Sequence, residues 1–308
     1  MSMTEKQILA VDIGGSKIMA GIVDHSGNVL SGFRENLPEN YNVEYVIDTI
    51  CDLAKKAGIE KASAAGVTIP GLADVKTGMW CYAPFSSIAN IPIVDILEKR
   101  LGIPVFIEND VNACAVAEMY YGTCRDSGSF LWVTVSNGVG GAVVLDGKLV
   151  SGESCSAGEI GHFIVEDNTS RRCGCGRCGC LEAMSSGRGI SQSYFELTGR
   201  RADAREIAEK AYREEAAASE AFAIAGRYLG KAISYCVNLL NISHIVIGGG
   251  VSQSFDLLKE PIEESLNRYV FAQANKKICL ESTKLGYNAA LLGAAAVAYK
   301  NLKGMQNE

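Results

Sequence analysis

Several features that mark other classes of protein are missing from this chain of 308 residues. No run of about 18 apolar residues occurs, so we expect no membrane span. Lysine and arginine number 29 against 35 aspartates and glutamates, and the net charge of −6 argues against a nucleic-acid surface, which needs a basic patch. The first seven residues lack the charged-then-apolar layout of an export signal. Eleven cysteines without such a signal indicate a reducing cytoplasm.

What is present indicates a mixed α/β protein, because apolar strands alternate with amphipathic helices, and the length suggests two domains or one large domain with a lobe. Glycine follows several of the expected helices, which is a common stop signal. Strands are expected at 8–11, 18–23, 104–107, 129–135, 142–145 and 244–247. Helices are expected at 44–57, 94–101, 111–121, 205–215, 219–240 and 289–302.

Glycine-rich turns join strands at two distant places, Asp12 to Lys17 and Ser136 to Gly141. Each turn links one strand to another strand, so neither is the strand–loop–helix motif of a dinucleotide or Walker site. Such turns expose backbone amides that can hold phosphate, although most of them are only hairpins. Two similar hairpins suggest two related halves with a nucleotide between them. A third cluster, Gly248 to Gly250, ends another strand and could lie against an adenine.

A candidate for chemistry follows the strand at 104–107, where the sequence reads Glu108, Asn109, Asp110. A carboxylate at the carboxyl end of a strand lies where α/β proteins place ligands. Asp110 could take a proton from a hydroxyl as a general base. The alternative is that it only caps the following helix, a frequent role for aspartate and asparagine.

Cysteines are concentrated in one short segment, where four of them occupy eight positions after a lone histidine. Thiolates and a neutral imidazole are the ligands of a tetrahedral zinc ion, and closely spaced cysteines on a glycine-rich turn can surround one. The alternative is a disulfide cluster. The five candidate ligands for four places are His162, Cys173, Cys175, Cys178 and Cys180. We expect the remaining cysteines to be mostly buried free thiols.

Seven motifs in a fixed order resemble the ROK family of sugar kinases and sugar-responsive repressors. They are DIGGSK at 12–17, IPG at 69–71, END at 108–110, SNGVGG at 136–141, GEIGH at 158–162, CGCGRCGCLE at 173–182 and IGGG at 247–250. The resemblance implies two actin-like ATPase (ribonuclease-H-like) α/β domains with an interdomain cleft and a zinc-binding loop. We expect domains at 1–120 and 121–288, the zinc loop at 162–182, and a final helix at about 289–308 that packs back on the first domain.

The resemblance also assigns roles. Asp110 matches the catalytic base, and Asn109, Glu159, His162 and Glu182 match sugar contacts. The residues implied to bind ATP are Asp12, Gly14, Gly15, Ser16, Lys17, Asn137, Gly138, Gly140, Gly141, Gly248, Gly249 and Gly250. The implied zinc ligands are His162, Cys173, Cys175 and Cys180, with Cys178 as an unliganded thiol. The implied reaction is transfer of a phosphoryl group from ATP with Mg²⁺ to a hexose, most often at its 6-hydroxyl, while the Zn²⁺ is structural.

Three positions depart from the glucokinase pattern: Asn137 stands where the kinases usually carry threonine, Phe85 where glucokinases usually have asparagine, and Ile88 where they usually have tryptophan. An N-acetylmannosamine, another N-acetylhexosamine or a β-glucoside is therefore an alternative substrate. Rival functions are a sugar-sensing ROK regulator without its DNA-binding domain, a sugar-binding scaffold and a zinc hydrolase. Only seven residues precede Ile8, which we take as an argument against a regulator. The family tendency implies a homodimer or homotetramer, without nucleic-acid or membrane partners.

Overall fold

The computed structural model describes residues 6–83, 88–271 and 277–305. The chain divides into two compact units. Unit 1 consists of Met1–Asp126, Ser151–Ala157 and Leu285–Glu308, and unit 2 of Ser127–Val150 and Gly158–Lys284. Unit 1 therefore takes in a short segment, Ser151–Ala157, that the sequence analysis assigned to the second domain. Among the described residues, no helix is both long and apolar enough to cross a membrane.

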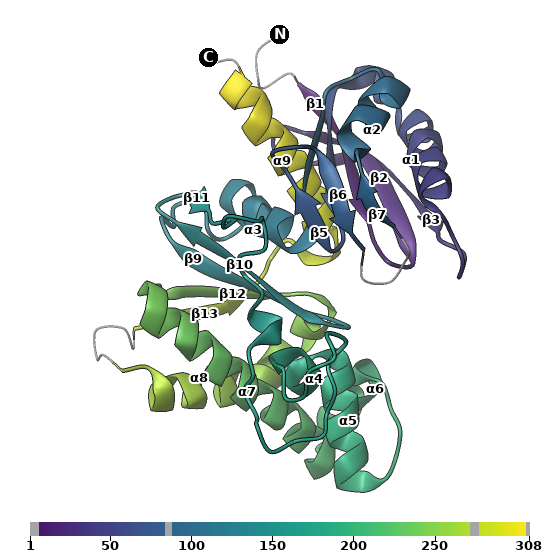
Figure 1. Cartoon of the computed structure of the whole chain (residues 1–308). Coiled ribbons are helices and arrows are strands. Elements are labelled where there is room, and N and C mark those ends of the chain that lie inside the picture. Colours follow the sequence, from purple (N-terminus) through teal and green to yellow (C-terminus); the bar gives the residue numbers. More distant parts are fainter. Residues whose placement is uncertain (1–5, 84–87, 272–276, 306–308) are drawn as a thin grey trace. The chain divides into compact units, whose positions relative to one another are not determined.

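Unit 1 is built on a five-stranded sheet in the order β3-β2-β1-β4-β8 (Figure 1). Its strands are β1 Gln7–Ile13, β2 Lys17–Asp24, β3 Val29–Asn36, β4 Ala62–Ile69 and β8 Val105–Asn109. The first three form an antiparallel meander, whereas β4 and β8 run parallel to β1. Parallel strands end at the same edge, so the carboxyl ends of β1, β4 and β8 bring Asp12, Thr68 and Asn109 to one edge of the sheet.

Helices cover both faces of this sheet, which is why β1 reads as a continuous apolar run. Leu9 and Val11 pack in one core with α1, and Ile8 and Ala10 alternate onto the other face against α9. Gly66 in β4 lets α9 approach, since a Cβ there would lie 1.8 Å from a carbonyl oxygen of that helix. The helices of unit 1 are α1 Val43–Ala57, α2 Ile93–Leu101, α3 Asp110–Tyr120 and α9 Ala289–Met305. A small sheet contains β5 Leu72–Asp74, β6 Met79–Tyr82 and β7 Ala89–Ile91.

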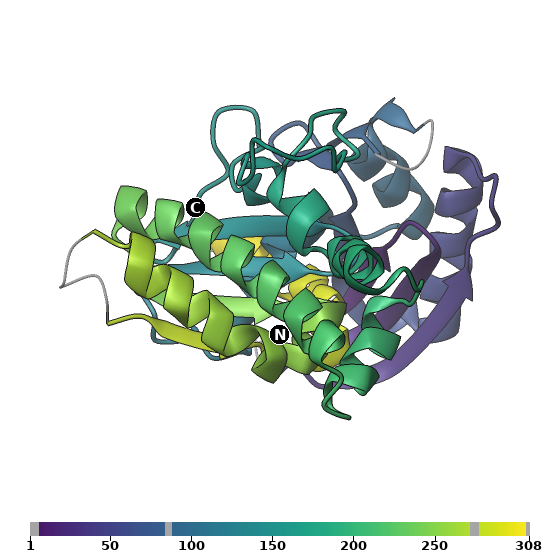
Figure 2. The ribbon, with the colours of Figure 1, turned by 90° about the horizontal axis from the view of Figure 1, so that it is seen from below.

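Unit 2 repeats the plan with a five-stranded sheet in the order β11-β10-β9-β12-β13. Its strands are β9 Phe130–Val135, β10 Val139–Leu145, β11 Lys148–Leu149, β12 His244–Gly248 and β13 Cys279–Ser282. Its α-helices are α4 Leu181–Ser185, α5 Gly187–Thr198, α6 Ala204–Ala211, α7 Ala216–Leu240 and α8 Phe255–Tyr269. The helices α7 and α8 run in the same direction and lie side by side (Figure 2), and their apolar residues share a core with β9 and β12.

Several expected elements need correction. The helix expected at 205–215 ends at Ala211, because Glu214 has a positive φ of 64° and Glu215 is the N-cap of α7. Helices α5 and α8 were not expected; α5 ends at the stop signal Gly199 but begins with two glycines, and α8 contains Pro261 and ends without a glycine. Cys279 is exposed on the edge strand β13 and is not the buried thiol expected from its apolar neighbours.

Candidate active site

The glycine turn of unit 1 joins β1 to β2 and is tightly closed. The Gly14 amide donates to the Lys17 carbonyl at 2.9 Å, and the Tyr41 hydroxyl donates to the Gly15 carbonyl at 3.3 Å. Asp12, just before the turn, accepts a hydrogen bond of 2.7 Å from the buried Thr68 hydroxyl. Burial raises the pKa of Asp12, opposed by this hydrogen bond and by Lys17. The turn therefore combines exposed backbone with a carboxylate whose orientation is fixed.

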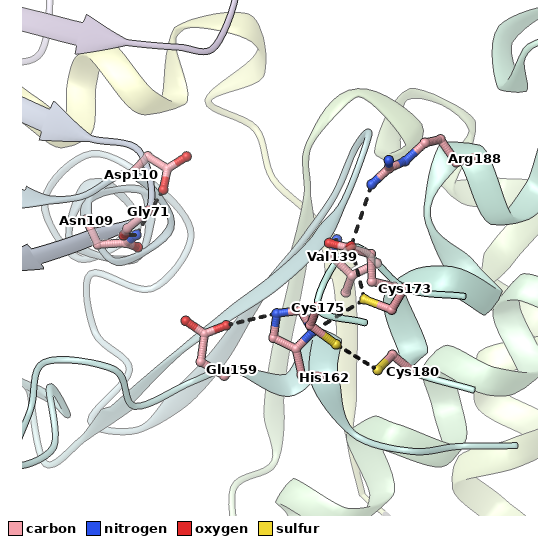
Figure 3. Close-up of polar contacts among 11 residues, drawn as sticks. Gly71, Asn109, Asp110, Val139, Glu159, His162, Cys173, Cys175, Cys180 and Arg188 are labelled. Carbon is pink, nitrogen blue, oxygen red and sulfur yellow. Dashed lines mark hydrogen bonds and ion pairs between the residues drawn. The ribbon is translucent and has the colours of Figure 1, made fainter. Parts of the chain in front are cut away.

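Asn109, and not Asp110, caps helix α3. The Asn109 side-chain oxygen accepts hydrogen bonds from the Val111 amide at 2.9 Å and the Asn112 amide at 3.1 Å. Its side-chain nitrogen donates to the Gly71 carbonyl at 2.8 Å and to Asp110 Oδ1 at 3.0 Å (Figure 3). Asp110 is the first residue of the helix and is half-buried. The capping role that competed with catalysis is thus taken by the neighbouring residue, which also holds the Asp110 carboxylate.

Glu108, the first residue of the same motif, supports the arrangement from the strand. Its carboxylate accepts from the Asn109 amide at 3.0 Å and from the Asn112 side chain at 3.1 Å. Burial raises the pKa of Glu108, and these two hydrogen bonds oppose that effect. In the END sequence, the side chains of Glu108 and Asn109 therefore make hydrogen bonds within the protein that hold the loop and the start of α3 in place.

The glycine turn of unit 2 lies between β9 and β10 and is tied to the start of α5. Within the turn, the Ser136 amide donates to the Gly138 carbonyl at 2.9 Å. The Gly187 amide donates to the Ser136 carbonyl at 2.7 Å, and Arg188 Nε donates to the Asn137 carbonyl at 3.0 Å. Arg188 is exposed, so a guanidinium lies beside the proposed phosphate turn. The sequence motifs did not assign Arg188 a role at the site. A cation next to a helix start was the feature of the sequence that could have suggested one.

The third glycine cluster joins the same edge of the sheet, because β12 runs parallel to β9 and both end there. Gly248 pairs with Thr134, and Gly249 has a φ of 86°. A Cβ at Gly249 would lie 2.4 Å from the Val135 carbonyl oxygen, so only glycine allows this approach. Gly248 to Gly250, which are expected to bind the adenosine, therefore lie at the end of β12, next to the glycine turn that follows β9.

The GEIGH segment lies directly on strand β10. A Cβ at Gly161 would lie 1.9 Å from the Val139 carbonyl oxygen, and one at Gly158 would lie 2.3 Å from that of Gly141. This close packing fixes the short 3₁₀ helix Ile160–His162 and with it the two polar side chains of the motif. Glu159 is exposed and its Oε2 lies 3.8 Å from His162 Nε2.

Four of the five candidate metal ligands converge, and one does not. One donor atom each of His162, Cys173, Cys175 and Cys180 lies within 4.8 Å of the other three. Cys173 Sγ is 3.6 Å from His162 Nδ1, and Cys175 Sγ is 3.6 Å from Cys180 Sγ (Figure 3). Thiolates 2.3 Å from a tetrahedral zinc are separated by about 3.8 Å, so the spacing fits. Cys178 is exposed and is not among the converging ligand atoms.

Local interactions shift the pKa values of two of these thiols in opposite directions, and only Cys175 is favoured as a thiolate. The backbone and side chain of Arg177 lower the pKa of Cys175 to about 6, whereas burial raises the pKa of Cys173 to about 12. The turn itself closes through the Cys173 amide, which donates to the Arg177 carbonyl at 2.8 Å, and it includes Gly176 with a φ of 89°. The arrangement can hold a soft or borderline cation.

Glu182 joins the cysteine loop to the glycine turn. Its Oε2 accepts from the Val139 amide at 3.4 Å, its Oε1 accepts from the Cys173 thiol at 3.4 Å, and Oε1 lies 3.6 Å from an Arg188 nitrogen. Glu182 and Arg188 also line a cavity of about 370 Å³ within unit 2. Glu182, which was expected to contact sugar, thus already makes hydrogen bonds within the protein. It also borders a cavity that a polar ligand can enter.

Comparison with known proteins decides what these motifs mean. Residues 8–301 match the ROK family. The chain belongs to the ROK family. The glucokinase of Thermotoga maritima is 29% identical over 98% of this chain and 100% of its own length. A crystal structure of a ROK family glucokinase from Streptomyces griseus, in complex with glucose and AMPPNP, shares 30% identity and a TM-score of 0.82 over 94% of this chain and 98% of that chain.

A regulator is also among the ROK relatives. The DNA-binding transcriptional dual regulator NagC of Escherichia coli is 28% identical over 96% of this chain and 76% of its own length. The ROK likeness confirms the recognition made from the motifs and the actin-like ATPase α/β fold. Phe85, on which the expectation about sugar preference depended, lies outside the described residues.

Proposed function

We propose that this ROK protein is an ATP-dependent, glucokinase-like hexose kinase whose catalytic base is Asp110. Full-length glucokinase relatives support the class of reaction. The observation that carries the residue assignment is the capping of α3 by Asn109, which leaves the Asp110 carboxylate as a half-buried, oriented group at the edge of the sheet. A carboxylate held there can accept the proton of a sugar hydroxyl, and we place the reaction at the 6-hydroxyl.

The two glycine turns are the proposed ATP-binding elements. The turn of Asp12 to Lys17 in unit 1 and the turn of Asn137 to Gly141 in unit 2 present backbone amides to phosphate, and Gly248 to Gly250 serve the adenosine. The Asp12 carboxylate, oriented by Thr68, is of the type that holds a hydrated Mg²⁺. When bound, Mg²⁺ offsets charge on the transferring phosphoryl group. We add Arg188 as a cation beside the second turn.

The sugar contacts are proposed for Glu159, His162, Glu182 and Asn109. The amide of Asn109 already makes four hydrogen bonds, so it contacts a hydroxyl only by exchanging one of them. Its main contribution is therefore to position Asp110. An N-acetylmannosamine, another N-acetylhexosamine or a β-glucoside remains the alternative acceptor.

The cysteine loop is proposed to hold one structural zinc through His162 Nδ1, Cys173, Cys175 and Cys180. Their donor set and spacing fit a closed tetrahedral site. His162 Nε2 then points toward Glu159, so the ring can bind metal on one side and contact sugar on the other. With four protein ligands, zinc has no position for a substrate, and it supplies a rigid support for the Glu159 and Glu182 carboxylates.

We also propose a homodimer or homotetramer located in the cytoplasm. An exposed apolar strip on unit 2 supports self-association: Phe163 lies 6.3 Å from Tyr235, ring centre to ring centre, and Ile164 and Leu239 are also exposed. The NagC likeness favours a sugar-sensing regulator as the second candidate function. A regulator binds sugar without turning over ATP, so turnover separates the two.

The deciding experiment is an ATP-coupled phosphorylation screen of the purified protein. The acceptors are glucose, mannose, fructose, allose, N-acetylglucosamine, N-acetylmannosamine and β-glucosides. A kinase transfers phosphate to at least one of them well above the rate of ATP hydrolysis without sugar. Sugar binding by calorimetry with no phosphorylated product would instead identify a sensor.

A further inference from the structure

A second group of metal-ligating side chains lies on unit 2, away from the cysteine loop in sequence. His244 begins β12, and Cys279 and Glu281 lie in the neighbouring strand β13. The two strands are parallel, and His244 is paired in register with Cys279. Residues two apart in a strand share a face, so Cys279 and Glu281 both point to the side of His244. The intervening Leu280 packs on the opposite face, in the core with Ile245.

The ligand atoms are close together and the imidazole is oriented. His244 Nε2 lies 2.8 Å from Glu281 Oε1, and one donor atom from each of the three residues lies within 4.8 Å of the other two. On the other side of the ring, His244 Nδ1 makes a hydrogen bond of 2.8 Å with the Ser127 hydroxyl. The Cys279 thiol is exposed, so an ion can reach the group from solvent.

We propose that His244, Cys279 and Glu281 form a second zinc site. Imidazole nitrogen, thiolate and carboxylate are together the ligands of zinc rather than of Ca²⁺ or Mg²⁺, which prefer oxygen. In a tetrahedral site the nitrogen and oxygen lie about 3.4 Å apart, so the Glu281 carboxylate recedes by about 0.6 Å to admit the ion. With the ion on Nε2, the Nδ1–H group donates to the Ser127 hydroxyl oxygen and this bond holds the ring, as the outer partner of a metal-bound histidine commonly does.

Three protein ligands leave the fourth position for water or an external ligand, so this site exchanges its zinc more readily than the closed cysteine loop. The ion also ties β13, an edge strand, to β12. This proposal rests on residues that the phosphoryl-transfer mechanism does not use, so it stands or fails independently of the kinase assignment.

The test is the zinc content of the full chain after equilibration with a small excess of zinc and removal of unbound ion. Cys279→Ser should carry one zinc equivalent fewer per chain than the wild type, and Glu281→Gln should lose the same equivalent. Cys178→Ser, which removes another exposed thiol, is the matched control and should keep the wild-type content. Ser127→Ala should retain the site with affinity roughly 10- to 100-fold weaker in a calorimetric zinc titration.

Because the readout is a difference between proteins, it does not depend on how much zinc the cysteine loop carries. Equal zinc content in the wild type and Cys279→Ser would overturn the proposal. So would loss of the same equivalent in Cys178→Ser, since the ion would then belong to exposed thiols in general. Co²⁺ added to the wild type after a mild chelator has removed the more readily exchanged zinc should give a thiolate-to-cobalt absorption band that Cys279→Ser lacks.

Discussion

Replacing Asn109 separates its two structural roles. Asn109→Asp keeps a side-chain oxygen to cap α3, but it loses the donors to Gly71 and Asp110. It also places a second carboxylate where the present contact to Asp110 is 3.0 Å. Two like charges about 4 Å apart repel by about 4 kcal/mol at an effective dielectric constant near 20. The pair therefore relaxes by moving Asp110 or by retaining a proton on one carboxyl group, and both outcomes impair the base.

We expect Asn109→Asp to lower kcat by at least tenfold and to move the acidic limb of the kcat profile to higher pH. Its free energy of unfolding should fall by about 2 kcal/mol, because the lost bond to Gly71 and the carboxylate repulsion outweigh the retained cap and the new favourable charge at the helix start. Asn109→Ala loses the cap as well as the bond to Gly71, so it should destabilise the fold by about 2 kcal/mol.

The assays are steady-state kinetics with the best acceptor across pH and urea unfolding of each variant. Asn42 provides a matched control, since it caps α1 by accepting from the Tyr45 amide at 2.9 Å. Asn42→Ala should cost about 1 kcal/mol of stability with unchanged kcat. If Asn109→Asp keeps more than half of the wild-type kcat, or alters only the KM for sugar, the bond to Asp110 does not position the base.

Three further predictions concern unit 2. Cys175→Ser should lose about one zinc per chain and destabilise the cysteine loop, whereas Cys178→Ser should keep this zinc; equal damage, measured by metal analysis and thermal unfolding, would mean that the wrong thiol was assigned. Arg188→Ala should raise the KM for ATP severalfold and leave that for sugar nearly unchanged, and the reverse result would place Arg188 at the sugar. Gly161→Ala should fold poorly or lose sugar binding, because its Cβ would lie 1.9 Å from the Val139 carbonyl; normal unfolding and kinetics would show that the GEIGH segment is not held against β10.

The sequence was most informative where a residue type is nearly obligatory. Closely spaced cysteines near a histidine suggest a metal-binding loop. The four ligands implied by the ROK resemblance are the four whose donor atoms converge in the structure, and Cys178 is not among them. Apolar runs also indicated the strands that carry the glycine turns. Asn109 and Asp110 are a different case, since both residue types cap helices and only coordinates show which one does so.

What the sequence could not indicate depends on contacts between distant segments. Glu182 contacts the Val139 amide, and Ser127 contacts His244. Each pair is far apart in the sequence and meets only because of tertiary packing, which no sequence motif indicates. The boundary between α6 and α7 depends on one residue with a positive φ, Glu214, a residue type that usually favours helix. Such features follow from tertiary structure and not from local propensity.

The most direct test of the proposed mechanism is the turnover of Asp110→Asn with its best acceptor sugar. Asparagine keeps the shape of the side chain but cannot accept a proton, so kcat should fall roughly a hundredfold to ten-thousandfold while sugar affinity stays nearly the same. Asp95→Asn, which alters another aspartate in the first turn of a helix, should retain full turnover. If Asp110→Asn retains a tenth or more of the wild-type turnover, Asp110 is not the base and the proposed mechanism is wrong.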